Sequence, residues 1–357
     1  MNKDLLKKII EYGIQAPSGD NSQPWNFVIT EDDKINIYNI PDRDNPILNV
    51  HEGGSMVSHG AVITNIRIVS DHFGYKAKIK YFPSDLESNL VVEISFEKND
   101  IENYLYKPSL FDSIYKRCTN RNFYQKDLPE SIMEDINKIQ GDDGINFRFF
   151  FKNEEKDFIS SKICLSEEII LQTEELHSLL FADVAWTKNE ELKKRHGLYV
   201  KTLEFNPVQL FVFWLCRKWK NISFLNKKIG FAHIVGKQNS DIYKSSGLLG
   251  FIIIKNTEKE TYVKAGELLQ YIWLKSTDLG LGFQPVTGLF FLNERIKVFG
   301  NDPISLENSN KITDAYDSLK DFAQIDKTDI ILTTFRIGKT KESSGRSSRL
   351  KPNIIIK

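Results

Sequence analysis

Residues 16–25 read APSGDNSQPW, and this stretch decides how the beginning of the chain folds. Before it, residues 4–15 carry apolar side chains at positions 5, 6, 9, 10 and 14, which is the spacing of an amphipathic helix. After it, residues 25–30 (WNFVIT) and 35–40 alternate like the two strands of a hairpin. Two prolines fix the loop, and its small and amide side chains can approach a flat ring and hydrogen-bond the edge of that ring. A plain turn is the alternative, because the same residue types are turn formers.

The remaining pattern predicts an α+β fold, with helices and antiparallel-leaning sheets in two units, the second beginning near Leu110. The apolar run GLLGFIII at 247–254 is expected to be a buried strand, whereas the aromatic-rich residues 197–245 are expected to be irregular. Further helices are expected at 53–73, 111–116, 129–139, 155–191 and 262–279, and further strands at 77–82, 89–96, 147–151, 329–337 and 353–356. No GxGxxG or GxxxxGK[ST] follows a strand, so the usual dinucleotide and P-loop signals are missing.

A second group of polar residues lies at 116–123, KRCTNRNF. Arg117 and Arg121 bracket a hydroxyl and an amide side chain, and a phosphate is bound by such a set of guanidinium and short polar donors. A solvated basic turn is the equally ordinary alternative. On the residues alone the two interpretations are equally good, so Arg117, Cys118, Thr119 and Arg121 are candidate ligand-binding positions.

Two later segments can contribute to the same site. GLGFQPVTG at 280–288 is a glycine-rich turn after a helix, whose backbone N–H groups can come close to a ligand near Thr287 and Gly288. After the expected strand at 329–337, a basic pair, Arg346 and Arg349, returns positive charge near the end of the printed sequence. A helix cap and an exposed basic tail are the respective alternatives.

In their residue patterns and flanking elements, these four segments resemble nitroreductase-like FMN enzymes. The string PSxxNSQPW resembles the loop that faces the flavin ring in that family, which implies cofactor-binding roles for Pro17, Ser18, Gly19, Asn21 and Gln23. Residues 117–123 resemble the family's R-x-S-x-R/K-x-F signature, which implies that Arg117, Thr119 and Arg121 hold the FMN phosphate. The resemblance also implies that Thr287 and Gly288 contact the ring near N5 and that Arg346 and Arg349 return a cation to the phosphate. Many family members carry an acidic residue where Thr287 stands.

The order of the segments departs from that of a single-domain member, because the ring-facing loop lies upstream of the phosphate signature. This resembles the fused, two-domain proteins of the Acg-like type, in which one chain mimics the family's homodimer. We therefore expect an N-terminal half at residues 1–108 with the ring-facing loop, and a C-terminal half at 109–357 with the phosphate site. The resemblance implies one FMN per chain and a monomeric pseudo-dimer.

Composition excludes several other classes of function. The 48 basic and 48 acidic residues balance, which argues against nucleic acid as the main partner. The three cysteines have no CxxC spacing and the six histidines no metal-binding spacing, which fits a reducing, cytoplasmic compartment and no metal site. The stretch VQLFVFWLC at 208–216 is too short to span a bilayer, which takes about 20 residues. A buried helix or a lid is the favoured interpretation there, and shallow membrane contact the alternative.

The expected activity is FMN-dependent oxidoreduction with NAD(P)H and a small aromatic or conjugated substrate, as the resemblance implies. The sequence names no catalytic acid or base, so the proton is expected to come from solvent. Residues 198–231 are the expected lid over the site. Two alternatives stay open: a protein that stores FMN under a closed lid with little turnover, and a dehydrogenase that tailors peptides.

Overall fold

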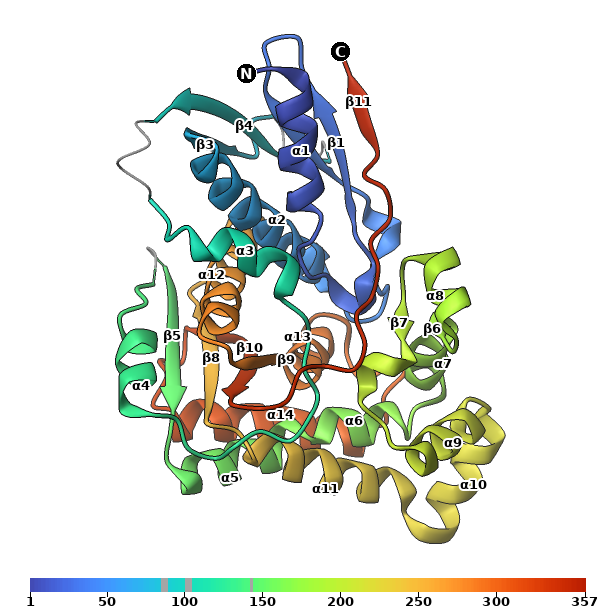
Figure 1. The fold of residues 1–357 in the computed structure, drawn as a ribbon. Helices are drawn as coiled ribbons and strands as arrows, with labels where there is room; N and C mark the ends of the chain where they lie inside the picture. The colour runs from blue at the N-terminus through green and yellow to red at the C-terminus, as the bar shows by residue number, and fades with distance from the viewer. Residues whose placement is uncertain (85–88, 100–104, 142–143) are drawn as a thin grey trace.

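The structure is a computed structural model that describes residues 1–84, 89–99, 105–141 and 144–357. It contains two separate sheets with helices between and outside them (Figure 1), so the predicted α+β class with antiparallel-leaning sheets is confirmed. The helices are α1 (Lys3–Gly13), α2 (Gly53–His72), α3 (Ser109–Lys116), α4 (Glu130–Asn137), α5 (Asn153–Ile163), α6 (Leu165–Ile170), α7 (Glu174–Ala182), α8 (Lys188–Lys194), α9 (Pro207–Cys216), α10 (Trp219–Ile229), α11 (Phe231–Lys244), α12 (Lys259–Asp278), α13 (Gly288–Phe299) and α14 (Leu306–Phe322). None of these described helices combines the length and apolar composition needed to cross a membrane.

The first sheet has the strand order β11-β1-β2-β4-β3. Its strands are β1 (Trp25–Ile29), β2 (Ile35–Asn39), β3 (Tyr75–Tyr81), β4 (Leu90–Lys98) and β11 (Ile354–Ile356). The predicted hairpin is present, because β1 and β2 pair antiparallel with Trp25 opposite Asn39. Strand β11 lies parallel to β1, with Phe27 opposite Ile354, so a segment from the far end of the chain completes the N-terminal sheet.

The second sheet has the order β5-β8-β10-β9 and is antiparallel throughout. Its strands are β5 (Ile145–Phe150), β8 (Leu248–Ile254), β9 (Gly282–Val286) and β10 (Ile330–Gly338), while β6 (Val184–Ala185) and β7 (Leu198–Tyr199) form a small separate pair. Every residue of β8 is buried, which explains its unbroken apolar sequence: the strand is covered on both faces.

Helices α2 and α12 pack against each other between the two sheets (Figure 1), and side chains of both lie in the largest hydrophobic core. Their backbones cross closely at two glycines. A Cβ atom on Gly60 would lie 1.9 Å from the carbonyl oxygen of Val263, and one on Gly266 would lie 2.0 Å from that of Val57. Neither position can hold a side chain unless the helices move apart.

Two parts of the chain differ from the sequence-based expectation. Residues 197–245, expected to be irregular, contain α9, α10 and α11. Asn206 caps α9, its side chain accepting from the backbone N–H of Gln209, and Pro207 occupies the first turn, so the start signals outweighed the low helix propensity of the aromatic residues. The glycine-rich segment after α12, expected to be a turn, forms strand β9, and the two helices α13 and α14 were not foreseen.

Replacing either crossing glycine by alanine should destabilise the protein, because one methyl group must fit where backbone atoms already touch. We expect Gly60→Ala and Gly266→Ala each to lower the free energy of unfolding by about 1–3 kcal/mol, measured by urea denaturation. Gly236→Ala in α11 is the matched control, since its new Cβ would meet neighbours at an ordinary 3.4 Å. Wild-type stability in both crossing variants would contradict the close packing.

Candidate functional site

The structure brings the loop at 16–25, the basic segment after α3 and the end of the chain together around one cleft of about 110 Å³. With residues 197–202, four separate stretches of sequence line it. The cleft is lined by nine of the predicted residues, namely Pro17, Ser18, Asn21, Arg117, Cys118, Thr119, Arg121, Arg346 and Arg349. It is also lined by Asp20, Gly197, Leu198, Thr202, Gly345 and Ser347, which the sequence analysis did not single out.

The loop between α1 and β1 has a sharply turned backbone. Asp20, Asn21 and Gln23 all have positive φ angles, 45°, 59° and 54°. This conformation is tolerated by Asp and Asn but is uncommon for Gln. Local hydrogen bonds hold it: the Gln23 N–H donates to Ser18 Oγ at 2.9 Å, and Arg43 donates to the Gln23 carbonyl at 3.0 Å. Such a fixed turn presents Ser18 and Asn21 at the cleft.

The basic segment is held by the second half of the molecule. Arg117 follows α3, and its guanidinium lies 4.5 Å from the ring centre of Trp273 on α12. It also donates to the carbonyl of Gln15 at 2.8 Å, which joins it to the other wall. Thr119 forms a parallel β-bridge with Phe283 of β9. This backbone pairing fixes the position of the segment that carries Arg121.

The C-terminal segment forms the third wall on its way from β10 to β11. Arg349 donates to Asn21 Oδ1 at 2.9 Å and to the carbonyl of Ala16 at 3.1 Å. The Leu350 N–H donates to Gln23 Oε1 at 2.9 Å. Arg349 and Leu350 of the C-terminal segment therefore contact the loop at 16–25 directly.

Residues 195–202 cover the cleft. Arg121 donates to the Thr202 carbonyl at 3.0 Å, and Gln23 Nε2 donates to the Arg195 carbonyl at 2.8 Å. Gly197 has a φ of 77°, and a Cβ there would lie 2.2 Å from the Asp183 carbonyl. No local sequence signal marks Leu198 or Thr202, because they are about 80 residues from the basic segment and reach it only through folding. Asp20, by contrast, lies within the loop at 16–25, and its polar side chain in that loop was a local signal for a cleft residue.

Positive charge dominates this cleft. Burial lowers the pKa of Arg117 well below its usual range, and Arg349 and Arg346 nearby lower it further. Burial and the Arg346 charge likewise lower the pKa of Arg349 to about 10. No carboxylate of the described residues forms a salt bridge with Arg117, Arg121, Arg346 or Arg349 within 4.0 Å. The nearest acidic influences are Asp20 on Arg121 and Glu191 on Arg349.

Two of these arginines also carry unused donors. The Nε atoms of Arg117 and Arg349 are buried and find no hydrogen-bond partner within the described part of the chain. Unsatisfied buried donors on adjacent cations are costly, and an anion with several oxygens would satisfy both the charges and the N–H groups. The residues therefore fit a phosphate group. Pockets that bury a whole drug-sized ligand measure about 300–1,000 Å³, so the present cleft suits the charged end of a larger molecule.

Four predicted residues do not line the cleft. Gly19 lies beside Asp44, and Gln23 is buried beneath the loop that it stabilises. Gly288 begins α13 and packs on α6, where a Cβ would lie 2.7 Å from Ser166 Oγ, and Thr287 directly precedes it. The structure does not bring Thr287 and Gly288 to the arginines, so their cofactor role stays a prediction.

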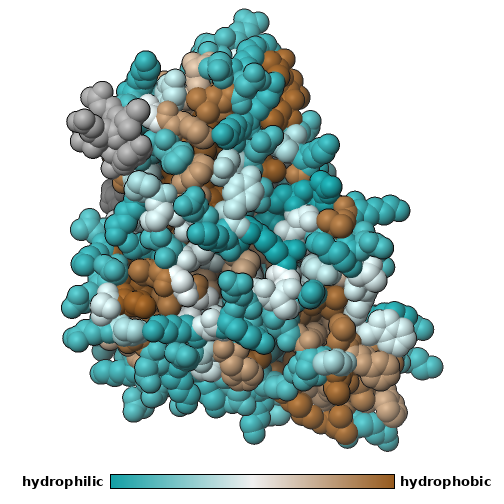
Figure 2. Space-filling model, in the orientation of Figure 1, coloured by the Kyte–Doolittle hydropathy of each residue, from teal (hydrophilic) through white to brown (hydrophobic). Residues whose placement is uncertain are grey.

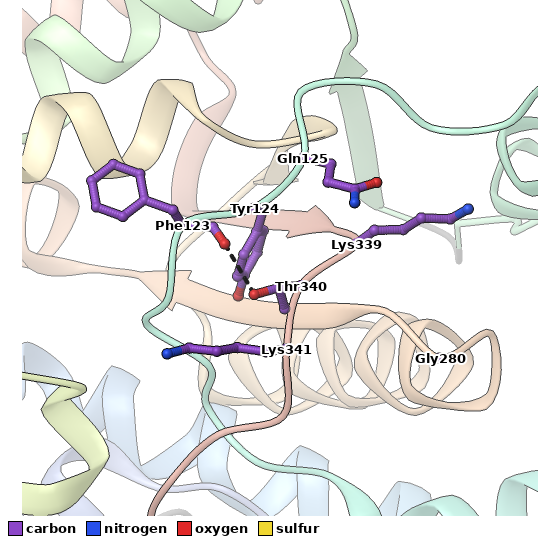
Figure 3. A pocket seen from close by; sticks show the side chains of 7 residues that line it. All are labelled: Phe123, Tyr124, Gln125, Gly280, Lys339, Thr340 and Lys341. Atoms are coloured by element: carbon purple, nitrogen blue, oxygen red, sulfur yellow. Dashed lines mark hydrogen bonds between the residues drawn. The ribbon is translucent and has the colours of Figure 1, made fainter.

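A second, shallower depression of about 550 Å³ lies between residues 123–125 and 339–341 (Figure 3). It contains none of the predicted site residues. Figure 3 shows Phe123 and the two lysines, Lys339 and Lys341, extending away from its centre, where Thr340 donates to the Phe123 carbonyl at 3.0 Å. Because these side chains point away from the centre of the depression, they offer a ligand there few contacts. The arginine-lined cleft is therefore the better candidate for a ligand-binding site.

No protein-family model matches the chain. An uncharacterised protein of Mycobacterium tuberculosis, MT1398, is 22% identical over 285 residues, which are 79% of this chain and 38% of that protein. The putative NAD(P)H nitroreductase acg of the same organism is 27% identical over 120 residues, 33% of this chain and 35% of that protein. The chain thus spans well under half the length of these curated relatives.

The solved structures that the chain resembles include nitroreductase-like proteins. One is a nitroreductase-like family protein from Bacillus cereus, with a TM-score of 0.35 and 11% identity, covering 70% of this chain and 94% of that one. Another is the FMN-dependent nitroreductase NfnB from Mycobacterium smegmatis, with a TM-score of 0.37 and 11% identity, covering 68% and 94%. At TM-scores below 0.5 these likenesses carry no argument about this chain.

The arginine cluster predicts that simple oxyanions stabilise the folded protein. At equal ionic strength, phosphate or sulfate should raise the melting temperature relative to chloride, with about 2.7 kcal/mol gained at one hundred times the dissociation constant. Arg349→Gln should reduce this gain, because it removes one donor, while Arg148→Gln on the exposed face of β5 should not. Equal melting temperatures in all three salts would contradict an anion site.

His59 on α2 is fully buried beneath the loop at 16–25, where its ring meets Trp25 edge-on at 6.4 Å and its Nε2 lies 3.2 Å from Asn39 Oδ1. Burial lowers the pKa of His59 from about 6.5 to about 3. Between about pH 3 and pH 6.5, His59 is therefore protonated in the unfolded chain and neutral in the folded chain. The stability due to neutral His59 is full above pH 6.5 and is lost as the pH falls toward 3, by about 1.4 kcal/mol per pH unit.

We expect His59→Gln to lose less unfolding free energy between pH 7 and pH 5 than the wild type does, as measured by urea denaturation at each pH. His51→Gln, at an exposed position, serves as the control and should keep the wild-type slope. A wild-type slope in His59→Gln would show that His59 takes up its proton in the folded state.

Proposed function

We propose that this chain binds FMN and acts as an NAD(P)H-dependent oxidoreductase of the nitroreductase-like type on a small aromatic or conjugated substrate. The observation that carries the proposal is the convergence of the loop at 16–25 with a cluster of arginines that lacks carboxylate partners among the described residues. The resemblance of these segments to the family's flavin-contacting motifs adds support, as does the 27% identity over 120 residues with a putative NAD(P)H nitroreductase.

In this proposal the arginines hold the cofactor's phosphate. Arg117 is fixed by Trp273 and by the Gln15 carbonyl, so its free Nε has a set direction. Arg349 is fixed in the same way by Asn21 and Ala16. Arg121 and Arg346 add charge from the remaining sides. A site whose donors are already fixed loses little entropy when the phosphate binds.

The loop at 16–25 would orient the flexible and ring portions of the cofactor. Ser18 and Asn21 offer a hydroxyl and an amide, and Pro17 and Leu198 offer apolar surface that excludes water. Bound FMN would supply two-electron redox chemistry, which no amino-acid side chain provides. We propose Gly19, Gln23, Thr287 and Gly288 as further contacts of the larger cofactor, reached outside the present cleft.

The site is built from both proposed halves of the chain, 1–108 and 109–357. Arg117 and Arg121 belong to the second half and the loop to the first, and the C-terminal segment runs between them. This favours one FMN per chain and a monomer that mimics a dimer, as part of the same proposal.

Storage of FMN with little turnover is a second candidate. The contacts that favour it are those that close the cleft, from Arg121 to Thr202 and from Gln23 to Arg195. Anaerobic addition of NADH or NADPH separates the two functions. Bleaching of the flavin band on a catalytic time scale supports an enzyme, whereas a stable oxidised spectrum supports storage.

The decisive measurement is flavin affinity with and without the phosphate. Purified protein should bind about one FMN per chain, and riboflavin more weakly. Arg121→Gln and Arg349→Gln should each weaken FMN binding by about tenfold to a hundredfold, since a hydrogen bond to a charged group contributes about 1.5–3 kcal/mol. They should leave riboflavin binding nearly unchanged.

Arg148→Gln is the charge-matched control and should bind FMN like the wild type. Equal affinity for FMN and riboflavin in the wild type, or no flavin binding at all, would contradict the proposed phosphate site.

A further inference from the structure

Helices α9 and α10 form a hairpin at one corner of the molecule, remote from both sheets (Figure 1). The charge of this region is one-sided. Residues 205–240 contain six lysines and arginines and no aspartate or glutamate, in a chain whose formal net charge is zero. The cations are Arg217, Lys218, Lys220, Lys227, Lys228 and Lys237, and all six are exposed.

Apolar side chains on the same hairpin face solvent. Val208, Phe211 and Leu215 follow one another at helical spacing on α9 and therefore share one face; Val208 is 72% exposed and Phe211 59%. On α10, Phe224 is 59% exposed. Figure 2 shows hydrophobic atoms gathered at this corner, where Figure 1 places α9 and α10. We call these residues and the six cations the hairpin patch.

The opposite side of the hairpin is firmly packed. Cys216 of α9 and Ile222 of α10 are buried in a small core with Leu171 and Ala232. Asn226 donates to the Leu171 carbonyl at 2.7 Å, and the N-cap at Asn206 fixes the start of α9. The hairpin patch is therefore presented by a rigid element, and its apolar side chains do not turn inward.

We propose that the hairpin patch binds the surface of an anionic lipid bilayer. Aromatic and aliphatic side chains beside a row of lysines and arginines are the composition of interfacial helices, whose apolar face enters the headgroup boundary while the cations meet acidic lipids. Trp214 illustrates the pairing, because its ring lies 4.1 Å from the Arg217 guanidinium on the adjacent turn. Tryptophan is also enriched at membrane–water boundaries.

Charge favours a lipid surface over a second copy of the chain. Two hairpin patches facing each other would bring twelve cations together without a carboxylate of their own, and like charges in contact oppose association. An anionic bilayer supplies the complementary charge and accepts the apolar side chains together. The α9 helix has only ten residues, so the contact is with the surface layer. This proposal does not rest on the flavin chemistry.

Vesicle sedimentation of the full-length chain tests it. We expect binding to phosphatidylcholine vesicles containing about 30% phosphatidylglycerol, at least tenfold weaker binding to pure phosphatidylcholine, and a loss of binding as salt is raised. Lys218→Gln combined with Lys220→Gln should weaken binding about 25-fold, since each cation near the surface contributes about a fivefold factor.

Phe211→Glu combined with Phe224→Glu should abolish binding. Two control pairs should bind vesicles like the wild type. The apolar control is Phe299→Glu with Leu306→Glu, because these side chains are similarly exposed, at 60% and 63%. The charge control is Lys76→Gln with Lys80→Gln, at exposed positions of β3. Thermal unfolding of every variant confirms that it is folded.

Three outcomes would overturn the proposal. Wild-type protein could remain in the supernatant with all vesicles, bind neutral and anionic vesicles equally, or bind with the same affinity after the hairpin substitutions. A concentration-dependent dimer that the Phe211→Glu and Phe224→Glu pair dissociates, without any vesicle binding, would assign the hairpin patch to self-association instead.

Discussion

The close crossing of α2 and α12 is the constraint on which the rest of the structure depends. Gly60 and Gly266 let the two backbones touch, and the two helices then hold the sheets on either side of them. Each helix also supports one wall of the candidate site. The ring of His59 on α2 packs on Trp25 at the end of the N-terminal loop, and Trp273 on α12 carries the guanidinium of Arg117. The crossing therefore positions both walls of the cleft, which the hydrogen bonds from Arg117 to Gln15 and from Arg349 to Ala16 then join.

The cleft has an excess of positive charge, because four arginines and one aspartate line it. Burial and the charges of Arg349 and Arg346 lower the pKa of Arg117, and burial and the charge of Arg346 lower that of Arg349. Both arginines keep buried Nε atoms without a partner in the described chain. By contrast, Arg336 of β10 is fully buried and donates to Gln284 Oε1 at 2.7 Å and to the Asn122 carbonyl at 2.8 Å, and it stacks on Tyr124. The donors of Arg336 are thus satisfied within the protein, as is usual for buried polar groups, whereas the two cleft arginines retain unpaired Nε atoms, which is compatible with the proposed phosphate site.

The segment from 195 to 231 contributes to both the arginine-lined cleft and the hairpin patch. Its beginning covers the cleft through the Thr202 carbonyl, and its helical part carries the hairpin patch. The sequence analysis treated this segment as one irregular lid. In the structure Leu198 and Thr202 line the cleft, while Val208 and Phe211 of α9 and Phe224 of α10 are exposed to solvent, so the two parts can serve different partners.

The sequence by itself determined the α+β class and the N-terminal helix–loop–hairpin, because strong periodicity and turn chemistry act over a few neighbouring residues. Nine of the residues that line the cleft were predicted from the resemblance of their segments to the motifs of a known family. The sequence did not reveal the helices at 207–244, whose aromatic composition hides their period, or the two helices after β9. Only the tertiary structure decided that β11 joins β1, that Leu198 and Thr202 line the same cleft as Arg121, and that Thr287 and Gly288 do not line it. Each of these depends on contacts between residues far apart in the chain, which are fixed by packing across the α2–α12 crossing and carry no local signal.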